Sequence, residues 1–283
     1  MGRENTVYLY GRVDDVRIKV DDEYHLISGR MAIRTIRRTY SNKQHMLLGQ
    51  DRWDRPAVYS RNEHILTEMK EVDRGDMVLI KGTLCTADTA RKFFCPECNH
   101  EQIEPKAVAI YVDPIFIKVI EHNDDISEEE ADELIRKNFE ISNQVYLLGT
   151  VCREPFDERD YVRDEERNTD RFQFQLASKR IRRIREDEPE KIVDFPWCKC
   201  YGEEAVKHHG MLHKGSSVYI DGAIQTRKIT LSTICEVCGE TLTKTGIATD
   251  IVPYHVEYID KCGEPFEPVD IEDVIEDDGS IPN

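Results

Sequence analysis

Two short cysteine motifs are the residues of this sequence best suited to metal chemistry. Cys95 and Cys98 enclose the dipeptide Pro-Glu, and Cys235 and Cys238 enclose Glu-Val. Two thiolates at this spacing can bind one tetrahedral ion through a tight turn, but a structural zinc site takes four ligands. We therefore favour a single zinc site that all four cysteines share. The alternative is one zinc ion for each motif, with Cys85 or His100 completing the first site and another cysteine the second.

Positive charge is concentrated in two segments, although the chain of 283 residues carries a net charge of −17. Residues 30–61 contain seven arginines and one lysine against two aspartates, and residues 179–185 contain four arginines and one lysine without any acid. The distribution of charge decides what a surface can bind more than its sum does. These segments are therefore candidate contacts for phosphate groups.

The sequence contains an internal repeat that frames both features. Residues 55–98 align without a gap on 195–238, so that Gly75 meets Gly215 and Gly82 meets Gly222. Both cysteines of the first motif fall on those of the second, and TVYLYGRV at 6–13 resembles QVYLLGTV at 144–151. A long self-similar period indicates two copies of one structural module.

Each copy shows the same succession of predicted elements. Alternating apolar residues predict strands near 7–11, 29–37, 55–61 and 77–84 in the first copy, and a helix fits 62–72. The second copy repeats this with strands near 145–149, 171–179, 195–201 and 217–224 and a helix at 203–213; closing strands fit 107–120 and 246–259. Three strands, a helix and two strands are typical of the OB-fold, a small Greek-key barrel. We therefore predict an all-β protein with minor α content, built from two tandem barrels with one helix between the third and fourth strands of each.

Two acidic segments lie outside the barrels. Ser127 and Glu130 form a capping-box pattern, which predicts an acidic linker helix at 128–138. After residue 262 the chain is acidic and poor in apolar residues, which indicates a disordered tail. The predicted organisation is a first barrel at 1–122, a linker at 123–142, a second barrel at 143–262 and the tail at 263–283.

The motifs that are missing also narrow the function. No apolar run is long enough to cross a membrane, and no signal peptide is recognisable, so the sequence predicts a cytoplasmic protein with reduced cysteines. We find no phosphate-binding glycine loop, nucleophile elbow or paired acid and base, so we expect no enzyme.

The second copy resembles the bacterial single-stranded-DNA-binding protein (SSB) family over about residues 143–259. Four separated motifs keep their order: 143–149, 172–177, 194–202 and 214–227, the last being the closest match. The first copy resembles the family more weakly, because Arg55 and Arg61 stand where the second copy has Phe195 and Tyr201. The family usually has one barrel per chain and lacks the paired cysteines. Its tail ends in Pro-Phe after an acidic cluster, whereas this chain ends in Pro282-Asn283.

The resemblance implies which residues contact DNA. Phe195 and Tyr201 stand where the family stacks bases, and Trp197 shares their face of a regular strand. The full set of predicted DNA-binding residues is Phe195, Trp197, Tyr201, Arg180, Arg182, Arg183 and Arg227 in the second copy, and Arg34, Arg37, Arg38, Tyr40, Trp53 and Tyr59 in the first. A single strand requires such a combination of flat rings and positive charge. The structural alternative is that the rings belong to the barrel core and the arginines to a solvated loop.

The resemblance implies a largely sequence-independent single-stranded-DNA-binding protein, near the nucleoid, that coats DNA during replication, recombination or DNA transfer. Its expected partners are single-stranded DNA and, through the acidic tail, replication or recombination proteins; a homodimer is one assembly that the sequence permits. One alternative is a zinc-stabilised adaptor for protein contacts in a replication or conjugation complex. The other is an RNA-binding protein, since barrels of this type accept either nucleic acid.

Overall fold

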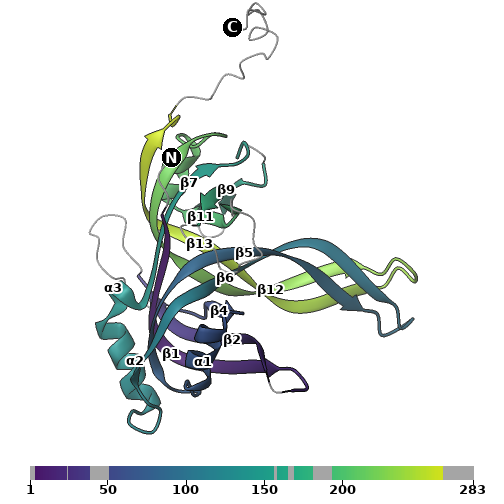
Figure 1. Ribbon diagram of the computed structural model, residues 1–283. Helices are drawn as coiled ribbons and strands as arrows, with labels where there is room; N and C mark the ends of the chain where they lie inside the picture. Colours follow the sequence, from purple (N-terminus) through teal and green to yellow (C-terminus); the bar gives the residue numbers. More distant parts are fainter. Residues whose placement is uncertain are drawn as a thin grey trace, which may run out of the picture.

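The computed structural model of the chain consists mainly of β-strands (Figure 1). It describes residues 4–23, 25–38, 51–155, 158–164, 169–180 and 193–263, and the side chains of these residues except 105–107, 164 and 169. The first half contains β1 (Asn5–Val20), β2 (Leu26–Arg37), β3 (Arg52–Asp54), β4 (Ala57–Ser60), α1 (Glu63–Lys70), β5 (Met77–Phe94) and β6 (Glu101–Glu121). Next come α2 (Glu128–Lys137) and α3 (Phe139–Ser142). The second half contains β7 (Asn143–Val151), β8 (Tyr161–Asp164), β9 (Thr169–Lys179), β10 (Val193–Asp194), β11 (Trp197–Tyr201), α4 (Glu203–His209), β12 (Ser217–Ile234) and β13 (Thr241–Asp260).

Each half closes into a five-stranded barrel, which confirms the predicted fold class. In the first half β1 pairs with β2, β2 with β4, β4 in parallel with β6, β6 with β5, and β5 with β1 again. In the second half β7, β9, β11, β13 and β12 close in the same order, with the parallel pair between β11 and β13. One helix lies between the third and fourth barrel strands of each half, as the OB-fold requires.

The strands bury one face because their side chains alternate. Leu9, Ile33 and Ile80 are fully buried in the first barrel, and Leu147, Phe174 and Ile220 are buried in the second. Gly75 and Gly215 follow the helices with φ of +102° and +91°, a conformation that glycine adopts without steric cost. Their equal positions in the repeat therefore reflect the same turn in both halves.

The two barrels are joined along β1 and β7, which pair antiparallel. Val7 lies opposite Val145. On either side of this pair the register is symmetric: Asn5 lies opposite Leu147, and Leu9 lies opposite Asn143. Since Val7 and Val145 are equivalent positions of the repeat, a local two-fold axis passes through this pair. The barrel strands of both halves therefore form one continuous sheet, and one chain has the arrangement of a symmetric dimer.

A reciprocal contact away from the axis reinforces this joint. Asp54 accepts from the backbone N–H of Thr226 at 2.6 Å, and its repeat equivalent Asp194 accepts from the backbone N–H of Thr86 at 2.6 Å. Both aspartates are buried. Each half therefore uses the same side chain to bind a strand of the other half.

The fourth and fifth barrel strands are longer than the sequence predicted. β5 and β12 run up to the residue before each cysteine motif, and β6 and β13 begin soon after it. The two hairpins leave the barrels and end with their tips close together (Figure 1). The third strands, predicted at 55–61 and 195–201, begin two residues later, at Ala57 and Trp197. The elements β8 and α3 were not predicted.

The linker helix agrees with its prediction. In α2 the Ser127 side chain accepts from the backbone of Glu130, and the Glu130 carboxylate accepts from the backbone of Ser127, so the capping box is complete. Ala131 and Ile135 are buried against the first half, together with Tyr10. No helix within the described residues is long and apolar enough to cross a membrane. Residues 264–283, nearly all of the predicted disordered tail, lie outside the described part of the chain.

A buried histidine on α4 leads to a prediction about pH. His208 is 2% exposed; its Nδ1 lies 2.6 Å from the Tyr258 hydroxyl, and burial lowers its pKa to about 4. Between pH 6.5 and 4 the unfolded chain protonates this residue while the folded protein does not, so stability should fall as the pH drops through this range, by up to about 3 kcal/mol. We expect His208→Gln to flatten this part of the curve in urea unfolding between pH 4 and 7.

Candidate functional site

The four cysteines of the two motifs meet at the hairpin tips. Their sulfur atoms all lie within 4.8 Å of one another. Cys95 Sγ is 3.5 Å from Cys238 Sγ, and Cys98 Sγ is 3.6 Å from Cys235 Sγ. A tetrahedral zinc ion with bonds of about 2.3 Å separates its sulfur ligands by about 3.8 Å. The donor set therefore fits zinc, and the structure favours the shared site over one ion per motif.

Neighbouring groups position these thiols. Phe93, Leu231 and Leu242 pack with Cys95, Cys98 and Cys235 in a small cluster separate from the barrel core. Backbone N–H groups of Cys238 and Val237 lower the pKa of the Cys235 thiol to about 6, which favours the thiolate that a metal binds. The arrangement is thus a preformed sulfur site between the hairpins.

A glutamine that the sequence did not single out links the two tips. Gln102 Nε2 donates to Thr233 Oγ1 and to the Ile234 carbonyl, both at 3.2 Å, and its Oε1 accepts from Glu236 N. Gln102 is 6% exposed. A buried amide that bonds across two hairpins depends on their tertiary arrangement, and no local pattern in the sequence marks it.

The predicted aromatic residues lie on the outer face of β11. Cys198 and Cys200 point into the core, so Trp197, Lys199 and Tyr201 share the opposite face. Tyr201 is 37% exposed, and Phe195, just before the strand, is 43% exposed. The guanidinium of Arg153 lies 4.9 Å from the centre of the Trp197 ring. Rings and a cation therefore occur side by side, as base stacking requires.

Polar groups surround Tyr201 from both halves of the chain. The Gln225 side-chain nitrogen donates to the Tyr201 hydroxyl at 2.9 Å. In this orientation of the amide, the Gln225 side-chain oxygen accepts from the Arg37 guanidinium at 3.1 and 3.2 Å. Arg37 also donates to Asp54 at 3.1 Å. The first half thereby contributes a guanidinium to the aromatic face of the second half.

A second group of charges converges on Asp250. Its Oδ2 accepts from Lys199 Nζ at 3.0 Å and from Arg227 Nη2 at 3.2 Å. Burial lowers the pKa of Lys199, and Asp250 opposes that shift. Two cations on one carboxylate leave an excess positive charge beside Tyr201. Arg227 was predicted as a DNA-binding residue. Lys199 was not, because it stands in the sequence between two cysteines that were predicted to lie in the core.

Arg180 does not lie in an open loop, contrary to its prediction. It follows β9 and is 9% exposed, with Nε 2.5 Å and Nη2 2.8 Å from the two oxygens of Asp194. This bidentate pair occupies the guanidinium in the interior. Arg182 and Arg183, predicted beside it, lie outside the described residues.

Two predicted residues of the first half contact the linker helix. Arg34 forms two hydrogen bonds to Asp132 of α2, at 3.0 and 2.9 Å. Its guanidinium also lies 4.1 Å from the centre of the Trp53 ring, which packs against the apolar side of α2. Both residues were predicted as DNA-binding candidates, and the helix that covers them is remote in sequence.

The remaining candidates of the first half differ in where they lie. Arg38 lies between the halves, 2.9 Å from Glu140 and 3.1 Å from Asp221. Tyr59 is half-buried on β4, where its hydroxyl accepts from Arg61 Nε at 2.9 Å and its ring meets Tyr111 edge-on. Tyr40 lies outside the described residues.

Comparison with known proteins finds a family match within the second half. Residues 142–243 match the model of the single-strand binding protein family. The matched segment includes β7 to β12 and all predicted DNA-binding residues of the second half. A search of curated protein sequences finds no significant match.

Solved structures share the fold over nearly the whole chain. The crystal structure of wild-type single-stranded DNA binding protein from Thermus aquaticus is similar with a TM-score of 0.55 and 14% identity, covering 92% of this chain and 95% of that chain. A deletion mutant of that protein gives a TM-score of 0.54 and 15% identity, covering 94% and 98%. At this identity the likeness establishes the fold, and it extends to both barrels and their arrangement.

Proposed function

We propose that the protein binds single-stranded DNA with little sequence preference, as a chain of two OB-fold units assigned to 1–122 and 143–262. The family match over residues 142–243 is the observation that carries this proposal. The exposed rings on the outer face of the matched barrel support it. Coating of exposed strands during replication, recombination or DNA transfer follows from such an activity.

The outer face of β11 supplies the two kinds of contact that a single strand needs. Tyr201, Trp197 and Phe195 offer rings on which bases stack irrespective of their identity. Arg227 and Arg153, whose side chains are 40% and 39% exposed, offer cations for the phosphates between those bases. Lys199 is left out because it is buried and paired with Asp250. Arg180 is left out of this proposed surface because its guanidinium is paired in the interior with Asp194.

We propose in addition that Cys95, Cys98, Cys235 and Cys238 bind one structural zinc ion. The ion would link the tips of two hairpins that belong to different barrels. Long hairpins have few buried contacts beyond the barrel and open readily. A metal between their tips would therefore fix the relative position of the two barrels' outer strands.

A role in protein contacts is the second candidate, because the hairpin tips expose apolar side chains. Phe94 is 62% exposed, and Ile234 and Val237 are each 65% exposed beside the cysteines. The net charge of −17 also favours an adaptor in a replication or conjugation complex. RNA binding remains the third candidate, since stacking and phosphate contacts serve both nucleic acids.

Fluorescence titration with labelled oligo-dT at several salt concentrations tests the main proposal. Tyr201→Ala should weaken binding by about 1–3 kcal/mol with an unchanged salt dependence, because stacking releases no counterions. Arg227→Gln should instead reduce the slope of log affinity against log salt by about 0.7, the value for one phosphate contact on a single strand. His25→Gln, far from β11 in the sequence and exposed, serves as a control without effect.

Each outcome separates the candidates. Equal effects of Tyr201→Ala on oligo-dT and oligo-U would leave DNA and RNA as joint ligands, whereas stronger binding of oligo-U would favour the RNA-binding candidate. Preference for duplex DNA, or no binding of any single strand, would contradict the proposal and leave the adaptor candidate.

A further inference from the structure

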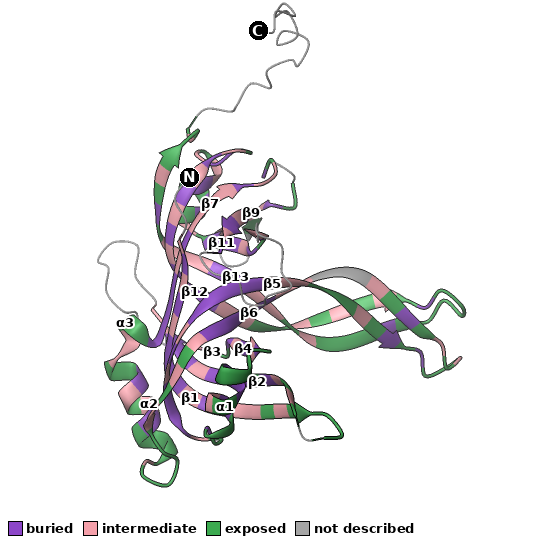
Figure 2. Ribbon diagram, viewed as in Figure 1, coloured by how far each residue is buried: buried purple, intermediate pink, exposed green. Residues whose placement is uncertain are grey.

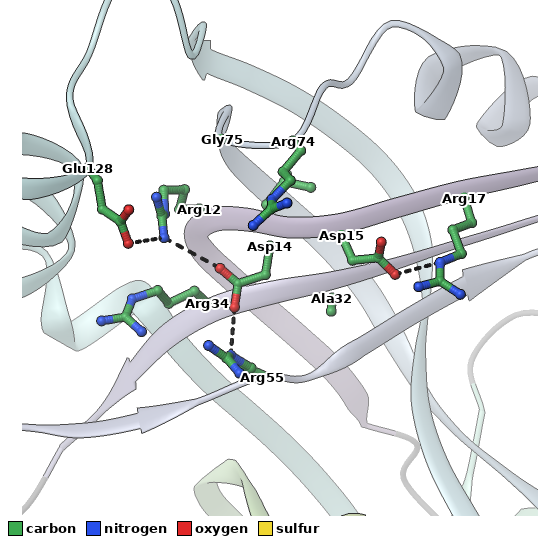
Figure 3. A pocket seen from close by; sticks show the side chains of 11 residues that line it. Arg12, Asp14, Asp15, Arg17, Ala32, Arg34, Arg55, Arg74, Gly75 and Glu128 are labelled. Atoms are coloured by element: carbon green, nitrogen blue, oxygen red, sulfur yellow. Dashed lines mark hydrogen bonds and ion pairs between the residues drawn. The ribbon is translucent and has the colours of Figure 1, made fainter.

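A pocket rich in arginine opens on the first half, lined by other residues than those of the aromatic face described above. Its volume is about 680 Å³, within the range of pockets that bind small ligands. The lining comes from β1 and β2, from the turn after α1, from the start of α2 and from Arg55 between β3 and β4 (Figure 3). The charged lining residues are Arg12, Arg17, Arg34, Arg55, Arg74, Asp14, Asp15 and Glu128. Five guanidinium groups thus face three carboxylates in a chain that is acidic as a whole.

The carboxylates fix the arginines in place. Asp14 lies between two of them, with Oδ2 2.6 Å from Arg55 Nε and Oδ1 3.6 Å from Arg12 Nη2 (Figure 3). Arg12 Nη2 also donates to Glu128 at 2.6 Å. Arg12 Nε is buried and has no hydrogen-bond partner among the described residues, and Asp14 Oδ2 is buried with Arg55 as an ion-pair partner but no hydrogen-bond donor. A buried donor without an acceptor is costly, and an anionic ligand would supply what it lacks.

Arg74 is the least constrained cation of the pocket. It is exposed, and its side chain makes no ion pair or hydrogen bond within the described part of the chain, although its carbonyl accepts from Asn123. Figure 3 shows its guanidinium directed toward the space above Asp14. This side chain is therefore free to meet an anion without breaking an existing contact.

The repeat relates this pocket to the aromatic face of the second half. Ala32 of β2 lines the pocket and pairs with Ala57 of β4. In the second half, the equivalent pair is Gln175 with Trp197. Two small side chains thus replace a tryptophan and a glutamine. Arg55 likewise occupies the position of Phe195. The first half has lost its rings at this place and has a space lined by guanidinium groups instead.

We propose that this pocket binds backbone phosphates of single-stranded DNA, so that the first half contacts the strand through charge while the second half stacks its bases. The inference rests on the proposed function, because it assigns a second site to the same ligand. Several guanidinium groups around one cavity match the oxygens of a phosphate, to which arginine forms paired hydrogen bonds. A site without aromatic rings should bind a strand with bases and a strand without bases with similar affinity.

The test uses a double variant, Arg55→Gln with Arg74→Gln, in the full chain. Affinity for oligo-dT and for an abasic strand of equal length is measured between low and moderate salt. We expect the slope of log affinity against log salt to fall by about 1.4 on both strands, which is about 0.7 for each phosphate contact. Tyr201→Ala should weaken binding of oligo-dT alone. The matched control is Lys70→Gln with Lys137→Gln, which removes two exposed cations of α1 and α2 that do not line the pocket.

Rescue and competition complete the test. Arg55→Lys with Arg74→Lys keeps both charges, so it should retain most of the slope and would show that the glutamine variant had not simply unfolded. An unchanged slope in the glutamine variant, beside wild-type binding of oligo-dT, would overturn the pocket and leave the proposed function intact. Failure of the wild-type protein to bind oligo-dT would overturn both. If polyglutamate binding depends on these arginines and DNA binding does not, the occupant is an acidic polypeptide and the inference is wrong.

Discussion

Replacing Cys95 and Cys98 together by serine is expected to remove all bound zinc, although Cys235 and Cys238 remain. The reason is geometric, because sulfur atoms from both motifs lie within 4.8 Å of one another and two thiolates alone make an incomplete site. Binding of a structural zinc ion is worth on the order of 10 kcal/mol, the largest single effect expected from any change in this chain. Elemental analysis should give about one zinc per wild-type chain and none per variant.

Loss of the zinc ion should at first destabilise only the two hairpins. The cysteines pack in their own small cluster, separate from the core of the barrels. Hydrogen exchange should therefore accelerate near residues 90–104 and 230–244 while the barrel strands stay protected. Cys152→Ser with Cys262→Ser is the matched control and should keep its zinc, because neither residue belongs to the cluster. Two zinc ions per wild-type chain would contradict the shared site, and none would contradict zinc itself.

The sequence predicted those parts of the molecule that local pattern and repetition determine. Alternating apolar residues gave the barrel strands, and Ser127 with Glu130 gave the start of α2. The meeting of the two cysteine motifs was predicted because a structural zinc site takes four ligands and each motif supplies two. In the structure, a two-fold relation between the barrels brings the equivalent hairpins to the same place, as Val7 opposite Val145 illustrates.

The length of the hairpins escaped prediction for a physical reason. Residues 86–92 and 225–233 are largely half-buried or exposed, so they lack the alternation that marks a strand with one buried face. Their backbone hydrogen bonds to β6 and β13 maintain the strands without such a pattern. Figure 2 shows this change from buried barrel segments to exposed outer hairpins.

The roles of the arginines were the least predictable part of the candidate site. A guanidinium can face solvent, an internal carboxylate or a ligand, and the choice depends on partners that lie far away in the sequence. Arg34 finds Asp132, 98 positions later, and Arg38 finds Asp221, 183 positions later. Charge clusters in the sequence therefore could not separate arginines that are paired within the protein from exposed ones.

Arg180→Met is expected to destabilise the protein by about 3–5 kcal/mol, because it leaves the carboxylate of Asp194 buried without its counter-charge. Asp194 is fully buried and also accepts from the backbone of Thr86, so the loss should extend to the contact between the barrels. Urea unfolding at pH 7 measures the change. Arg227→Met is the matched control; its side chain is 40% exposed and its partner Asp250 keeps Lys199, so a loss of about 0–1 kcal/mol is expected.

A compensating substitution distinguishes a structural arginine from a phosphate contact. Adding Asp194→Asn to Arg180→Met removes the buried charge, and the double variant should recover part of the lost stability because no unpaired ion remains inside. The salt dependence of oligo-dT binding should be the same for the double variant and the wild type, since Arg180 is already paired within the protein. If the double variant instead had a smaller slope of log affinity against log salt and unchanged stability, Arg180 would be a DNA-binding residue. The bidentate pair with Asp194 would then be a contact that DNA displaces.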